Sequence, residues 1–99
     1  MTIKFIYSDN SQLSILEKVK SLYKDRNIKF EGFDFNIYKD KKKAYKVLGA
    51  CSARLIPFCS IYNDNNELIK AFYSEVSECT ENNIVKYLDN YIKLNKNNG

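Results

Sequence analysis

The sequence predicts an α/β domain whose strands and helices follow one another as β-α-β-α-β-β-α. Short runs of β-branched and aromatic residues are separated by longer segments in which apolar residues recur at helical spacing. A polar turn between the third and fourth strands predicts an antiparallel hairpin beside strands that helices connect in parallel. We therefore expect a mixed four-stranded sheet with helices on both faces.

The chain is long enough for one domain. Its 99 residues are 44% hydrophobic and 14% aromatic, which suffices for one core and excludes a disordered chain. It contains no repeat, linker or second hydrophobic unit. We predict a single domain over residues 1–99, with residues 95–99 as a frayed polar tail.

The first half of the chain contains two strands and the helix between them. Thr2–Tyr7 is the first strand, and residues 8–11 are the turn and N-cap residues of a helix that ends by Asn27. Residues 28–36 form the second strand. Gly32 lies where the alternation slips, which indicates a β-bulge.

A second, lysine-rich helix is expected over residues 37–48, with Gly49 as its C-cap and residues 50–52 as a loop. Its spacing predicts a buried side made of Tyr38, Ala44, Tyr45 and Leu48.

The last part of the chain predicts a hairpin followed by a helix. Residues 55–62 form an apolar strand with Pro57 near its start, residues 63–66 turn, and residues 67–74 return. Thr80 is the expected N-cap of the final helix. Its apolar stripe is Ile84, Val85, Leu88, Tyr91 and Ile92.

The absence of histidine restricts the possible chemistry. It excludes a Ser-His-Asp triad, a Cys-His dyad and any zinc site containing histidine. The three cysteines, Cys51, Cys59 and Cys79, have no C-x-x-C spacing and no fourth ligand, so we expect no metal and reduced thiols. Cys59 should be buried and Cys51 exposed in its loop. We leave a Cys51–Cys59 disulfide as an alternative, which requires their Cα atoms to lie within about 7 Å.

The charge is mildly basic. Sixteen Lys and Arg against twelve Asp and Glu give +4, and the one dense run of lysines spans residues 39–46. We interpret this run as a solvated helix face whose tyrosines, Tyr38 and Tyr45, point inward. Nucleic acid is therefore not an expected partner.

No stretch approaches the ~20 apolar residues of a membrane span, so we expect no membrane association and a cytoplasmic location. The frequent Lys, Asn, Ile and Tyr are typical of AT-rich coding sequences, which points to a low-GC bacterium or its phage. A phage protein would lie in the host cytoplasm or in the virion.

Three local patterns resemble the thioredoxin and glutaredoxin family over roughly residues 2–94. Leu48-Gly49 is followed by Arg54 and by Ile56-Pro57, which is similar to the loop that carries the family's cis-proline. The strand–polar turn–strand of residues 61–69 and the V-K-Y-L-D-N-Y pattern of the last helix are also similar. The resemblance implies a thioredoxin-like fold with a cis peptide bond before Pro57.

One position departs from that family. Its redox C-x-x-C lies between the first strand and the first helix, where this chain has Ser11 and Ser14. A hydroxyl cannot form a disulfide, and no histidine is present to activate it. The dithiol mechanism is therefore absent. The serines either cap the helix, which we favour, or retain a ligand site at the helix N-terminus.

The resemblance implies a redox-inactive module that binds a partner protein, with no cofactor. The implied contact surface is the family's groove, made here of Ser11, Gln12, Ser14, Ile56, Pro57 and Ser74. A glutathione- or thiol-dependent oxidoreductase or transferase that uses Ser11 or Cys51, with glutathione bound, is the alternative. A nucleic-acid-binding accessory protein is a third hypothesis. Whether the chain is an enzyme stays open, with a non-catalytic role favoured, and so does its oligomeric state.

Overall fold

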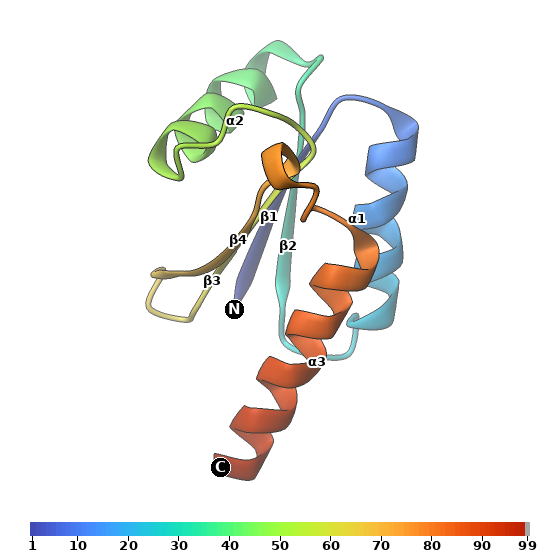
Figure 1. Ribbon diagram of the computed structural model, residues 1–99, viewed down its shortest axis with the longest axis vertical. Helices are drawn as coiled ribbons and strands as arrows, with labels where there is room; N and C mark the ends of the chain where they lie inside the picture. Colours follow the sequence, from blue (N-terminus) through green and yellow to red (C-terminus); the bar gives the residue numbers. More distant parts are fainter. Residues whose placement is uncertain (99) are drawn as a thin grey trace.

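The computed structural model describes residues 1–98 and contains a four-stranded mixed sheet with three α-helices (Figure 1). The strand order is β2-β1-β3-β4; β1 and β2 are parallel, and the β1–β3 and β3–β4 pairs are antiparallel. The predicted α/β class and the mixed sheet are confirmed. The elements are β1 (Thr2–Tyr7), α1 (Asn10–Leu22), β2 (Lys29–Asp34), α2 (Tyr38–Ala50), β3 (Phe58–Tyr62), β4 (Leu68–Phe72), a short 3₁₀ turn η1 (Ser74–Val76) and α3 (Glu81–Asn98).

The sheet separates two hydrophobic cores, because successive side chains of a strand point to opposite faces. On β1, Phe5 enters the core under α1 and α3, and Ile6 enters the core under α2. Figure 1 shows α2 on one side of the sheet and α1 and α3 on the other. The expected helices on both faces are confirmed.

The start of α1 lies where the sequence predicts it. The side chain of Asp9, the N-cap, accepts a hydrogen bond from the backbone N–H of Gln12 at 2.8 Å. Just beyond the helix, the buried Tyr23 hydroxyl donates to the carboxylate of Asp89 at 2.5 Å and to the carbonyl of Val85 at 3.2 Å. This hydroxyl therefore ties the end of α1 to α3.

The expected bulge at Gly32 is wrong. The pairing of β1 with β2 runs without a shift from Thr2 opposite Lys29 to Tyr7 opposite Asp34. A Cβ atom at position 32 would lie only 2.8 Å from Cδ2 of Leu16. The glycine breaks the alternation because a helix side chain occupies the space where its own side chain would be.

Helix α2 differs from its prediction at both its end and its buried side. It continues to Ala50, so Gly49 lies inside the helix and Cys51 is the C-cap. The side chains of Tyr38 and Tyr45 are 74% and 58% exposed, although both were expected to be buried. The buried side consists of Ala44, Val47 and Leu48. Small and aliphatic residues bring the helix close to the sheet, and its tyrosines are turned out to solvent.

The strands of the hairpin are shorter than predicted. β3 begins at Phe58, after a cis peptide bond between Ile56 and Pro57. The turn is confirmed: Asn66 has a φ of 62°, and the Asn63 side chain accepts from the N–H groups of Asn65 and Glu67. Proline lacks the N–H that a strand ladder needs, which accounts for the late start of β3.

The C-terminal helix begins as predicted, since the Thr80 hydroxyl oxygen accepts from the N–H of Asn83 at 3.2 Å. The helix continues to Asn98, so the expected frayed tail is helical up to that residue. Gly99 lies outside the described residues. No helix in the described part of the chain combines the length and apolar character needed to cross a membrane.

Tyr23→Phe should lower the free energy of unfolding by about 1 kcal/mol, because it removes the hydroxyl that joins α1 to α3 and keeps the ring. Burial and the bond to Asp89 raise the pKa of Tyr23 above its ordinary 10.0. The folded state therefore holds this proton more tightly, and the stabilisation is complete below pH 10 and lost as the pH rises beyond it.

Urea unfolding at pH 7 and above pH 10 measures both effects. The difference between wild type and variant should narrow at the higher pH. Tyr45→Phe, which alters an exposed ring, is the matched control and should change little. Equal losses in both variants would contradict the assigned role of the Tyr23 hydroxyl.

Candidate functional site

The ends of all four strands meet at one edge of the sheet. Phe58 pairs with Ile6 on β1, so Pro57 lies next to the point where β1 ends. Ser74 follows β4 at the same edge, and its hydroxyl donates to the carbonyl of Pro57. The Asn36 side chain, beyond β2, donates to the carbonyl of Ser8 at 2.7 Å. We call this region the cis-proline edge.

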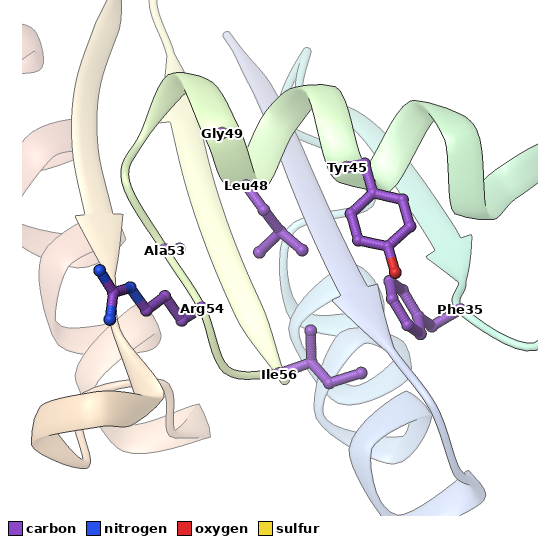
Figure 2. A pocket seen from close by; sticks show the side chains of 7 residues that line it. All are labelled: Phe35, Tyr45, Leu48, Gly49, Ala53, Arg54 and Ile56. Atoms are coloured by element: carbon purple, nitrogen blue, oxygen red, sulfur yellow. The ribbon is translucent and has the colours of Figure 1, made fainter.

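A hollow of about 420 Å³ opens beside this edge, on the α2 side of the sheet (Figure 2). Leu48 from α2 and Ile56 from the loop point into it, and the Phe35 and Tyr45 rings meet at its other end with centroids 5.3 Å apart. We call it the Ile56 hollow. Its lining is Phe35, Tyr45, Leu48, Gly49, Ala53, Arg54 and Ile56.

The loop that leads to Pro57 is held by the carboxylate of Glu75. This group accepts the backbone N–H of Arg54 at 3.0 Å and that of Leu55 at 3.3 Å. The hydrogen bond from Arg54 stabilises the charged form and lowers the pKa of Glu75. The backbone N–H and C=O of Ile56, the next residue, form no hydrogen bond with any other described residue. These two groups therefore stay unpaired within residues 1–98.

The polar residues at the start of α1 bind one another. The Ser11 hydroxyl donates to the Asp9 carboxylate at 2.7 Å, and the Gln12 side-chain oxygen accepts the Ser8 N–H at 2.7 Å. Hydrogen bonds from the Gln12 N–H and from Ser11 lower the pKa of Asp9. Ser14 is half-buried one turn further on. Asp9 therefore caps this helix, and the expectation that Ser11 and Ser14 cap it is wrong, because both serines lie inside α1.

The structure thus brings together only part of the predicted groove. Ile56, Pro57 and Ser74 meet at the cis-proline edge. Ser11, Gln12 and Ser14 belong to α1 and do not line the Ile56 hollow.

The expected exposure of Cys51 is wrong. Its side chain is 7% exposed and lies in the core on the α2 side of the sheet. Helix α2 extends beyond Leu48, so Cys51 follows Val47 and Leu48 by four and three residues and lies on the same buried face of the helix. Burial raises the pKa of its thiol. Cys59 and Cys79 lie in the other core, so the sheet separates Cys51 from Cys59 and the disulfide left open above is excluded.

The sequence reasoning missed several residues of the Ile56 hollow. Phe35 and Tyr45 were expected on a strand and in a core, and Arg54 entered only through the family resemblance. Leu55, next to Ile56 in the chain, and Val76, at the end of η1, are 52% and 63% exposed. Leu55 and Ile56, two adjacent apolar residues before Pro57, were the pattern in the sequence that could have indicated this surface. Because β3 begins only at Phe58, both residues lie outside the sheet.

No protein-family model matches the chain, and no curated protein is significantly similar to it. Among residues 1–98, no three or more acidic, cysteine or histidine side chains gather in a way that could hold a metal ion.

The folded protein should react slowly with thiol reagents at pH 8, because all three cysteines are buried and burial also raises the pKa of Cys79 to about 12. A chromogenic disulfide should modify three thiols in urea and none at a comparable rate in buffer. Cys51→Ser should leave the native rate unchanged. A fast native phase that this substitution removes would restore Cys51 as a reactive thiol.

Glu75→Gln should loosen the loop before Pro57. It replaces the charged carboxylate that accepts two backbone N–H groups with a neutral amide, which weakens both hydrogen bonds. The lowered pKa of Glu75 means that its contribution is present at neutral pH and lost as the pH falls below the ordinary value of 4.5. In NMR titrations, the Arg54 and Leu55 amides should shift with a midpoint below 4.5. Glu67→Gln is the control, and equal effects on these amides would contradict the contact.

Proposed function

We propose that this chain is a thioredoxin-like module without dithiol chemistry that binds an extended segment of a partner protein at the cis-proline edge. The observation that carries the proposal is the unpaired backbone N–H and C=O of Ile56 beside an apolar hollow. Main-chain hydrogen bonds supply affinity for an extended peptide, and a neighbouring pocket supplies side-chain specificity.

The arrangement of elements supports the thioredoxin-like part of this proposal. The chain order, the mixed four-stranded sheet and the cis peptide bond before Pro57 agree with what the resemblance implies. Ser11 and Ser14 stand where the family's cysteines would be. The three cysteines present are buried in the two cores instead.

The surroundings of the edge favour a protein segment over a small thiol. Leu55, next to Ile56 in the chain, and Val76, next to the Glu75 that holds this loop, are further exposed apolar residues. Neither group considered for a glutathione-dependent reaction is placed to meet a small thiol. The Cys51 side chain is buried, and the Ser11 hydroxyl donates a hydrogen bond to Asp9. An extended peptide would instead contact the backbone of Ile56 and the exposed apolar side chains near it.

Selection from a displayed library of random peptides tests the proposal. Selected peptides should perturb the NMR signals of Ile56 and its neighbours. Ile56→Arg should weaken their binding by at least about tenfold, because it places a charge at the centre of the apolar contact. Leu22→Arg, which makes the same kind of change at an exposed site on α1, is the control and should bind normally.

Two results would overturn the proposal. One is a set of selected peptides that bind wild type and Ile56→Arg equally. The other is reduction of insulin or of glutathione disulfide by the wild-type chain, with turnover lost in Ser11→Ala or Cys51→Ala. That result would restore the thiol-dependent alternative.

A further inference from the structure

The outward side of α2 carries a second hollow, of about 530 Å³, that none of the Ile56 hollow residues lines. Tyr38 and four lysines, all of them on α2, line it. We call it the lysine hollow; its lining is Tyr38, Lys39, Lys42, Lys43 and Lys46. The lysines occupy three successive turns of the helix, about 5.4 Å apart along its axis.

The positive charge of this surface is not neutralised within the protein. Helix α2 contains five lysines and a single acidic residue, Asp40. Among the described residues, no lysine of α2 forms an ion pair. The Asp40 carboxylate instead accepts the backbone N–H of Asp34 at 3.2 Å. Five like charges on one short helix create a field that attracts an anion.

An exposed aromatic ring lies among these charges. Tyr38 is exposed to solvent, and the Lys42 ammonium lies 5.8 Å from its ring centroid. Tyr38 and Tyr45 were expected to point into the core, which disfavoured nucleic acid as a partner, but both side chains are exposed. Since the Lys42 ammonium lies over one face of the Tyr38 ring, a flat partner would stack on the opposite face.

We infer that the lysine hollow binds single-stranded nucleic acid. Its ammonium groups would contact phosphates, and the Tyr38 ring would stack on a base, which is the combination that sequence-tolerant single-strand binding uses. An acidic peptide would satisfy the lysines but would leave the exposed ring without a role. Single-stranded nucleic acid uses both features of the surface.

Fluorescence anisotropy with a labelled oligothymidylate tests the inference. If four lysines each neutralise one phosphate, affinity should fall about 50-fold between 50 and 200 mM salt, from a slope of about −0.7 per contact on logarithmic axes. Lys42→Glu/Lys43→Glu should abolish most of the binding. Lys20→Glu/Lys24→Glu, with the same change in net charge on the α1 side of the sheet, should bind much more tightly than that variant.

The ring has its own test. Tyr38→Ala should weaken binding at least about fivefold, and Tyr38→Phe should retain it, because stacking needs the ring and not the hydroxyl. Position 38 is exposed, and circular dichroism should confirm that both variants stay folded. Polyglutamate is included as a competitor of similar charge density.

Three results would overturn the inference. They are no binding at 50 mM salt, equal losses in the two charge-reversal pairs, or polyglutamate competing as well as the oligonucleotide while Tyr38→Ala has no effect. The last of these would identify an acidic protein segment as the ligand. Because Ile56→Arg leaves the lysine hollow intact, peptide binding at the cis-proline edge can fail or succeed independently.

Discussion

The antiparallel pairing of β3 with β1 is the constraint on which the site depends. Pairing Phe58 with Ile6 fixes where β3 begins, and so places Pro57 beside the end of β1. β4 then pairs with β3 so that Ser74 reaches the carbonyl of Pro57. A shift of one residue in this register would exchange the two faces of β3 and move Cys59 from one core to the other. The register between β1 and β3 therefore determines both the position of Pro57 and the composition of the two cores.

Sequence patterns were sufficient where local chemistry decides the structure, as in Thr2–Tyr7, the Asp9 cap region and the Asn-rich turn. They failed where packing between elements decides. Gly32 resembles a bulge in the sequence, but its cause is a Leu16 side chain from another element. Gly49 resembles a helix end, but α2 continues past it and turns Cys51 into the core. Periodicity cannot supply such contacts between distant segments.

The composition of α2 explains why it contributes to two different surfaces. Its buried stripe of Ala44, Val47 and Leu48 is narrow, so most of its circumference is left to solvent. Tyr45 lies beside that stripe and reaches the Ile56 hollow, while the lysines lie further round. A lysine-rich helix of this kind is stabilised by the close fit of small residues to the sheet. Its charges are then free to face a ligand.

The hydrogen bonds at the start of α1 do not suit a reactive thiol at position 11. A reactive thiol at a helix N-terminus needs the free N–H groups there to stabilise its thiolate. In this chain the Asp9 carboxylate accepts the N–H of Gln12 and the hydroxyl of Ser11. A thiolate at position 11 would have no proton to donate to this carboxylate, would compete with it for the Gln12 N–H and would be repelled by its charge. The local structure thus favours a capped helix start and disfavours a nucleophile at position 11. At the cis-proline edge, the groups left to contact a partner are the backbone N–H and C=O of Ile56.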